Sequence, residues 1–183
     1  MFLTMHKRHL AMLLGGVMLA LDASADVRPQ GLFIQAGAGD DSARAASIGA
    51  VWPWSWQRQV AGGRLEGVTE AYVGRWSVKD KGGRVGFTHV GVVPVLRYRF
   101  GAGRSPWFIE GGIGLTYMDR IYRASDKQFS TQFNFADVLG AGRNFGEGQR
   151  YELSVRLTHF SNGGLEHPNP GMNLVRLRYG LMF

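Results

Sequence analysis

The sequence NLVRLRYGLMF, residues 173–183, alternates between two kinds of side chain. One set of alternate positions is apolar, namely Val175, Leu177, Tyr179, Leu181 and Phe183. Arg176 and Arg178 stand between them. Because successive side chains of a β-strand point to opposite faces of a sheet, the segment predicts a strand with one apolar and one charged face.

Seven further segments of about ten residues have period-two patterning and are separated by clusters of Gly, Asp, Ser, Lys and Arg. With the last segment, the predicted strands are residues 32–39, 44–54, 64–76, 86–100, 107–118, 133–145, 150–161 and 173–183. Their length and alternation predict an all-β chain folded as an eight-stranded antiparallel transmembrane β-barrel. The terminal Phe183 is similar to the assembly signal of outer-membrane proteins.

The second face of these strands is rich in glycine and charge, which suits a narrow polar interior. The chain holds 27 glycines. We expect a network of paired charges inside the barrel, since buried charges must pair; its predicted members are Arg97, Arg99, Glu110, Glu152, Arg156, Arg176 and Arg178. A secreted lipocalin-like barrel, with the apolar face inward, is the alternative fold.

Composition excludes several classes of protein. The 183 residues include no cysteine, which rules out disulfide scaffolds, zinc-thiolate sites and cysteine nucleophiles. The mean hydropathy is -0.11. No stretch after the first 25 residues approaches the ~18 apolar residues that a membrane helix needs, so a helical membrane protein is excluded.

The first 25 residues have the features of a secretory signal peptide. Lys7 and Arg8 precede an apolar stretch, residues 10–21, and Ala23-Ser24-Ala25 is a small-residue cleavage site. We therefore expect residues 1–25 to be removed and residues 26–183 to form one barrel domain in the bacterial outer membrane.

Because the number of predicted strands is even, we expect both ends of the barrel chain on the periplasmic side. The connections 40–43, 77–85, 119–132 and 162–172 then face outward, whereas residues 101–106 and 146–149 form short periplasmic turns. The 55–63 turn is longer than this scheme prefers. The formal net charge of +7 indicates anionic lipid head groups rather than nucleic acid, since no basic helix or stacking module is present.

Three polar residues fall on the face that the apolar residues assign to lipid. His159 and Ser161 have the parity of Val155 and Leu157, and Asn173 opens the neighbouring strand with the parity of its apolar face. Polar groups that face hydrocarbon are costly unless they meet one another or have a function. His159 and Ser161 are about 7 Å apart along a strand.

This grouping is suited to nucleophilic catalysis, in which a serine needs a base and the base needs an orienting group. We interpret Ser161 as the nucleophile, His159 as the base and Asn173 as the orienting group. The 162–164 turn, with Asn162 and Gly164, and the side chain of Asn169 are candidates for the oxyanion donors. An interfacial histidine beside an ordinary Ser-Asn-Gly-Gly turn is the alternative interpretation.

The segment HFSNGGLEHPNPG, residues 159–171, closely resembles the signature of the outer-membrane lipid A 3-O-deacylases, the PagL type. Phe135-Ala136-Asp137, residues 140–142 and residues 108–114 extend the resemblance. The resemblance implies an eight-stranded barrel with a Ser-His-Glu triad on its outer face, which cuts the acyl ester at position 3 of lipid A. It also implies that His159 is the base and Ser161 the nucleophile.

The chain departs from that pattern at one position. Asn173 stands where the family has the acidic triad member, and an amide accepts a hydrogen bond from imidazole but lacks the charge that stabilises imidazolium. Glu166, in the adjoining loop, is an alternative third member.

The predicted partner is lipid A, or lipopolysaccharide, of the outer leaflet, with Arg120, Arg123 and Lys127 as candidates to attract its phosphates. We expect no cofactor and no metal; His89 has inward parity and no companion ligands, and His167 faces solvent. A homodimer is left open. The alternative function is a structural or adhesive outer-membrane barrel without activity, in which Asn173 marks a lost triad.

Overall fold

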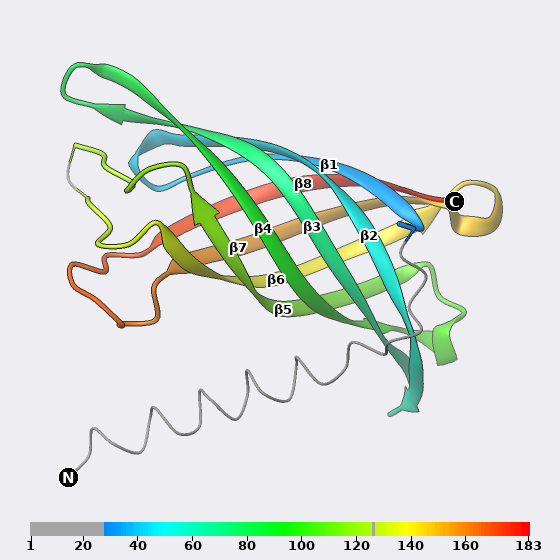
Figure 1. Cartoon of the computed structure of the whole chain (residues 1–183). Helices are drawn as coiled ribbons and strands as arrows, with labels where there is room; N and C mark the ends of the chain where they lie inside the picture. The colour runs from blue at the N-terminus through cyan, green and yellow to red at the C-terminus, as the bar shows by residue number, and fades with distance from the viewer. Residues whose placement is uncertain (1–27, 126) are drawn as a thin grey trace, which may run out of the picture.

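Eight antiparallel strands close into a barrel in the computed structural model, which describes residues 28–125 and 127–183 (Figure 1). The strands are β1 (Gly31–Gly39), β2 (Ala43–Val60), β3 (Gly63–Asp80), β4 (Gly83–Arg99), β5 (Trp107–Met118), β6 (Phe133–Phe145), β7 (Tyr151–Ser161) and β8 (Met172–Met182). The predicted signal peptide lies outside the described residues. The barrel closes where β1 pairs with β8, for example Ile34 with Tyr179.

Short turns and longer loops lie at opposite ends of the barrel. The 3-10 turns η2 (Gly101–Gly103) and η3 (Glu147–Gln149) are at one end, called the turn end below. The 3-10 turn η1 (Asp40–Ser42) and the connections 119–132 and 162–171 are at the other, the loop end. No helix of the described residues is long and apolar enough to cross a membrane.

Two predicted connections are wrong because the strands continue through them. β2 extends to Val60, and its pairing with β3 resumes after an irregularity between Pro53 and Gln57. Proline lacks the N–H that a continuous ladder requires, which explains a break at this position. A two-residue turn then remains, Ala61 and Gly62, both with positive φ. At the loop end, β3 and β4 extend likewise and leave residues 81–82 as their turn.

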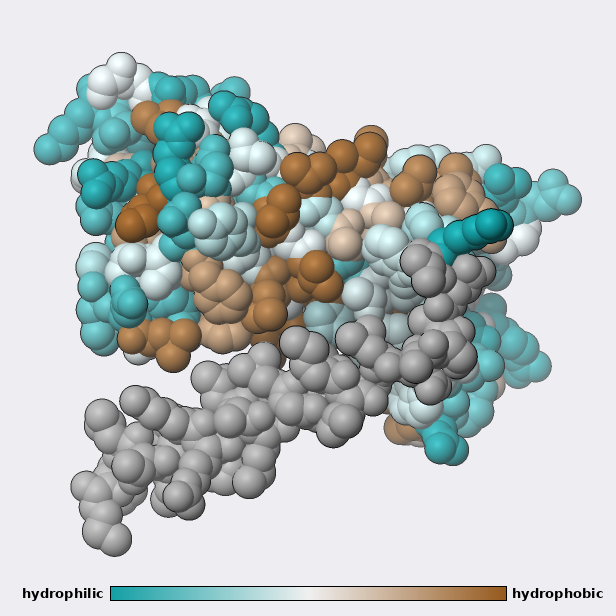
Figure 2. All heavy atoms as spheres, viewed as in Figure 1, coloured by the Kyte–Doolittle hydropathy of each residue, from teal (hydrophilic) through white to brown (hydrophobic). Residues whose placement is uncertain are grey.

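The outer wall is apolar, as the alternation predicts. Leu157, Val175 and Leu177 are each exposed by 52–55% although they are large and apolar. Figure 2 shows hydrophobic side chains around the middle of the barrel and mainly hydrophilic ones toward its ends. This distribution matches a membrane-spanning barrel and excludes the lipocalin-like alternative, whose apolar face would line the interior.

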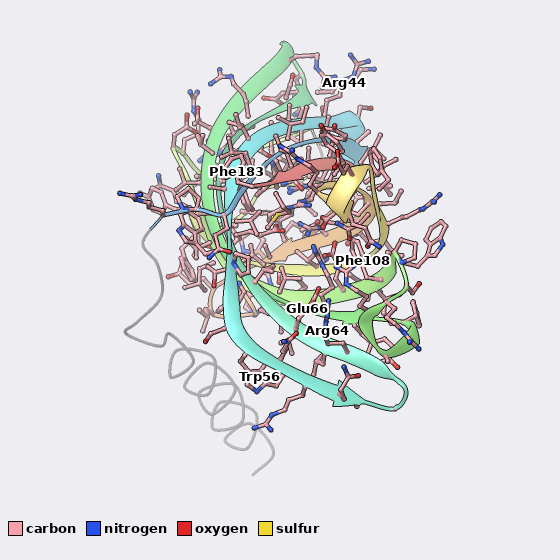
Figure 3. The ribbon with its side chains drawn as sticks, turned by 90° about the vertical axis from the view of Figure 1, so that its right-hand side faces the viewer. Arg44, Trp56, Arg64, Glu66, Phe108 and Phe183 are labelled. Atoms are coloured by element: carbon pink, nitrogen blue, oxygen red, sulfur yellow. The ribbon has the colours of Figure 1, made fainter. Side chains whose placement is uncertain are left out.

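Charged and aromatic side chains fill the interior. Arg97 lies 2.8 Å from Glu110 and 2.6 Å from Glu152, and Arg156 lies 2.6 Å from Glu110. Figure 3 looks in from the turn end, where Glu66 pairs with both Arg64 and Arg99 at 3.0 Å. The predicted charge network is therefore confirmed for most of its members.

Arg176 departs from that prediction, because it makes no ion pair with any residue that the structure describes. Its guanidinium instead lies 5.0 Å from the ring centroid of Phe160. Conversely, Glu70 was not predicted, and it pairs with Arg156 at 2.6 Å and with Arg178 at 3.0 Å.

The interior next to the loop end is an aromatic core. Its buried members are Trp76, Phe87, Tyr122, Phe129 and Phe160. His89 is buried beside them, with its ring centroid 5.1 Å from that of Trp76, so its predicted inward parity is confirmed. Because Tyr122 and Phe129 come from the 119–132 connection, this packing fixes that loop in the mouth of the barrel.

Candidate active site

His159 and Asn173 are direct neighbours across the β7–β8 ladder. Both side chains lie on the outer wall, where Leu157 and Val175 form the adjacent apolar pair. Ser161 is the last residue of β7 and has the same outward parity. The structure therefore brings the three residues to one face at the loop end, as the sequence pattern predicts.

A hydrogen bond joins His159 to Asn173. His159 Nδ1 lies 2.8 Å from Asn173 Oδ1. Asn173 Nδ2 lies 3.1 Å from a carboxylate oxygen of Asp40, which only accepts, so the amide must present its oxygen to the imidazole. Nδ1 then carries the proton, and Nε2 has the lone pair that a general base needs.

The Asp40 carboxylate is a member of this cluster that the sequence reasoning missed. Its Oδ2 accepts hydrogen bonds from the backbone N–H and the side-chain amide of Asn173, both at 3.1 Å. Lys127 Nζ lies 3.3 Å from the same oxygen. Partial burial disfavours the charged carboxylate, but the Asn173 hydrogen bonds and the Lys127 ammonium outweigh it and lower the pKa of Asp40.

Barrel closure is the signal that would have located Asp40. The β1–β8 ladder pairs Gly39 with Leu174, so the residue after β1 must lie beside the residue before Leu174. The two backbones approach so closely that a Cβ atom on Gly39 would overlap with the Asn173 carbonyl oxygen. Only glycine permits that approach.

Ser161 and the histidine are adjacent but not hydrogen-bonded. Among the described residues, the Ser161 hydroxyl has one hydrogen bond, accepted from the Gly163 N–H at 3.4 Å. Catalytic hydrogen bonds are often long or absent in a free enzyme and form only with substrate bound. The geometry therefore leaves Ser161 available to His159 Nε2.

The loop after Ser161 is tied together by buried Asn162. Its backbone N–H donates to Asn169 Oδ1 at 3.1 Å, and its Oδ1 accepts from the Gly164 N–H at 2.9 Å. Its side-chain amide donates to Ser130 Oγ and to the Glu166 carbonyl, both at 2.8 Å. Of the predicted oxyanion donors, only the Asn169 side-chain amide has no acceptor among the described residues.

Glu166 is not at the histidine. Its side chain is exposed, and none of the described residues forms a hydrogen bond or ion pair with its carboxylate. The Nδ1 position that an orienting acid would occupy is taken by Asn173. His167 is exposed in the same loop, as predicted.

An open groove of about 470 Å³ runs down the outer wall from this cluster. Asp40, His159 and Asn173 line one part, and apolar residues that include Leu139, Leu157 and Val175 line the rest. Asp137, opposite His159 on β6, adds a further carboxylate to the lining. The groove thus combines the predicted base His159 and its partners with an apolar surface able to hold a hydrocarbon chain, while Ser161 lies outside the lining.

Gly171 fixes the position of the imidazole from the side of the loop. It has a φ of 69°, and a Cβ atom there would lie 2.7 Å from His159 Cε1. The loop backbone therefore packs against the ring, and a larger residue would displace it.

Comparison with known proteins identifies relatives over most of the chain. The family model described as lipid A 3-O-deacylase (PagL) matches residues 44–182. The lipid A deacylase PagL of Pseudomonas aeruginosa is 35% identical over 145 residues, which cover 78% of this chain and 80% of the relative. The lipid A deacylase PagL of Bordetella bronchiseptica is 31% identical over 176 residues, 93% of this chain and 95% of the relative.

A solved structure agrees with these matches. The crystal structure described as the outer membrane enzyme PagL superposes with a TM-score of 0.71 at 32% sequence identity. The match covers 84% of this chain and 99% of that one.

Proposed function

The chain belongs to the lipid A 3-O-deacylase (PagL) family, and from this premise we propose that it hydrolyses the 3-O-linked acyl ester of lipid A by serine catalysis on its outer wall. It is an outer-membrane β-barrel enzyme of the lipid A deacylase type. The observation that carries the serine mechanism is the outward cluster of His159, hydrogen-bonded at Nδ1, with Ser161 two residues away on the same face.

Acylation begins when His159 Nε2 accepts the Ser161 hydroxyl proton. The serine oxygen attacks the ester carbonyl carbon and forms a tetrahedral intermediate. Collapse of the intermediate breaks the bond to the sugar oxygen, and the imidazolium returns its proton to that oxygen as the hydroxyl leaves. Water, deprotonated by His159, then cleaves the acyl-serine and releases the fatty acid.

The oxyanion needs donors that are fixed before the reaction. In this proposal the Asn169 side-chain amide is the first donor, because it has no acceptor among the described residues, and the Gly164 N–H is the second. Gly164 contributes only after its N–H releases the Asn162 side chain, to which it is bonded at 2.9 Å. The Asn162 backbone N–H is similarly committed to Asn169 Oδ1, so Asn162 acts mainly by holding the loop.

The acyl chain would lie in the groove below the cluster. Leu157, Val175 and Leu139 line it, and Val155 and Leu177 continue the same apolar face. A substrate resident in the outer leaflet reaches such a groove laterally, without leaving the membrane. The ester then lies at the height of His159 and Ser161.

The three residues predicted to attract phosphates differ in their surroundings: Arg123 is exposed and stays a candidate, whereas Arg120 and Lys127 lie beside carboxylates. Lys127 is held by Asp40 at 3.3 Å, and Arg120 lies 3.7 Å from Asp119. Arg44, Arg75, Arg84 and Lys79 instead form a row of exposed cations at the loop ends of β2, β3 and β4, without a carboxylate partner among the described residues (Arg44 is labelled in Figure 3). Since β1 alone separates β2 from β8, we assign lipid A phosphates to this row.

The non-catalytic alternative does not explain the groove or the tautomer that Asn173 selects. All groups in the proposed mechanism come from one chain, and the comparisons give no support to a homodimer.

The proposed function is tested by mass spectrometry of lipid A from a host that lacks this activity. Expression of the protein is expected to remove one 3-hydroxyacyl chain and Ser161→Ala to remove none. An unchanged profile with folded wild-type barrel would contradict the function.

A further inference from the structure

A catalytic histidine gains from a nearby negative charge, and the residue bonded to His159 is neutral. An amide fixes the tautomer but does not stabilise imidazolium by charge. We propose that Asp40 is the positioning residue that supplies this charge, acting on His159 through the Asn173 amide. This inference rests on the proposed function, since it assigns a role within the same site.

The hydrogen-bond geometry links the three residues in one direction. Asp40 Oδ2 accepts from Asn173 Nδ2, and Asn173 Oδ1 faces His159 Nδ1. The carboxylate therefore polarises the amide so that more negative charge lies on the oxygen that meets the imidazole. When Ser161 gives up its proton, the imidazolium that forms is stabilised by this polarised oxygen and by the field of the carboxylate behind it.

The carboxylate is fixed before the reaction. The Asn173 backbone N–H holds the same Oδ2, and Lys127 Nζ lies 3.3 Å away on the 119–132 connection. The neighbouring Asp41 accepts a hydrogen bond from Tyr122 at 3.1 Å and lies 3.9 Å from Lys127 Nζ. Since Tyr122 is buried in the aromatic core, the loop that carries Asp40 is attached to the interior of the barrel.

A carboxylate at position 40 can take over part of the task of an acid at position 173. Asp40 is ionised at neutral pH as an ordinary aspartate is, and its hydrogen bonds and the Lys127 ammonium lower its pKa further. The charged groups that face this cluster are Asp40, Asp41 and Lys127 from the loops and Asp137 from β6. Of these, Asp40 alone is bonded to the orienting amide.

The central experiment compares Asp40→Asn with wild type. The quantity measured is the rate at which the purified protein hydrolyses lipid A in detergent micelles. Loss of the hydrogen-bond partner behind a metal-bound histidine typically costs about 10- to 100-fold, and we expect kcat here to fall by a similar factor while KM changes by less than about twofold. The acid limb of the kcat/KM pH profile is expected to move to lower pH, because imidazolium loses a stabilising charge. A purely structural role for Asp40 would not move that limb.

Asp119→Asn is the matched control. It removes one negative charge from an exposed pair with Arg120 at the same end of the barrel and leaves the contact between Asp40 and Asn173, so its kcat and pH profile are expected to stay within about twofold of wild type. The shift in gel mobility between boiled and unboiled samples reports whether each barrel is folded.

The second variant moves the carboxylate from the loop to the strand. Asn173→Glu alone places two carboxylates together, whereas Asp40→Asn/Asn173→Glu holds one, directly on the imidazole. The double variant is expected to be at least about tenfold faster than Asp40→Asn, because its acid acts as in a complete triad.

The inference is overturned if folded Asp40→Asn keeps the wild-type rate and pH profile, or if the double variant is no faster than Asp40→Asn. Failure of the proposed function is distinct from both outcomes, because the folded wild-type barrel would then release no acyl chain from lipid A.

Discussion

Asn173 Oδ1 lies 2.8 Å from His159 Nδ1, across a pair of residues that the β7–β8 register places directly opposite each other. The contact leaves Nε2 as the free nitrogen on the side of the imidazole that must serve Ser161. It also means that tautomer selection in this chain depends on an amide and not on an acid.

Removal of that amide should affect catalysis without affecting the fold. Asn173→Ala is expected to lower kcat about 10- to 100-fold, because the imidazole loses its orienting partner. Asn173 is exposed, so the barrel should fold normally. Initial rates of lipid A hydrolysis in micelles measure the effect, and a wild-type rate for Asn173→Ala would remove this residue from the mechanism.

The groove predicts that a larger side chain on the outer wall lowers kcat/KM only where that side chain lines the groove. Val175→Phe adds volume beside Leu157 and should reduce kcat/KM about 5- to 150-fold, since overfilling an apolar site costs about 1–3 kcal/mol. Val92→Phe on β4 is the matched control, because Val92 is equally exposed, at 51% against 52%, on another part of the wall. Equal losses in the two variants would indicate a general effect on the barrel.

The row of exposed cations at the loop ends of β2, β3 and β4 predicts that KM depends on the phosphates of the substrate. Arg75→Ala should raise KM for phosphorylated lipid A about fivefold, because one cation near a membrane surface contributes about 1 kcal/mol. The same variant should leave KM for dephosphorylated lipid A unchanged. Arg120→Ala is the control, since Arg120 already lies beside Asp119. A rise with both substrates would argue against a phosphate contact.

The interior network predicts a stability effect that is separate from catalysis. Glu110 joins Arg97 and Arg156, and it is almost fully buried. Glu110→Gln should lower the free energy of unfolding by about 3 kcal/mol, since it leaves buried charge uncompensated. Asp119→Asn, in an exposed pair, should change it by less than about 0.5 kcal/mol. Urea unfolding of the barrel in micelles compares them.

The sequence predicted the strands well wherever alternation was uninterrupted. The bounds of β5 and β6 agree with the pattern because turn residues flank both strands. The end of β2 was missed because Trp54, Trp56 and Gln57 interrupt the alternation. The facing ends of β3 and β4 were missed because residues 77–85 are rich in Gly, Lys and Arg, and pairing with the partner strand decides whether such segments remain extended.

Part of the site was predictable because strands alternate. His159, Ser161 and Asn173 lie on one face by this alternation, which the sequence shows directly. Asp40 is 133 residues from Asn173 along the chain, and the two meet only because the first strand closes on the last. Lys127 was expected at the phosphates because its contact with Asp40 depends on how the 119–132 connection packs in the mouth of the barrel, which the sequence pattern does not show.

The central claim is that Ser161 is the nucleophile and His159 its base. Labelling of the purified barrel with a fluorophosphonate, followed by peptide mass mapping, tests it most directly, because the reagent reacts with serines activated by a base. We expect one adduct, on Ser161, which is absent from Ser161→Ala and strongly reduced in His159→Ala. An adduct on another residue, or lipid A hydrolysis by Ser161→Ala at the wild-type rate, would contradict the mechanism.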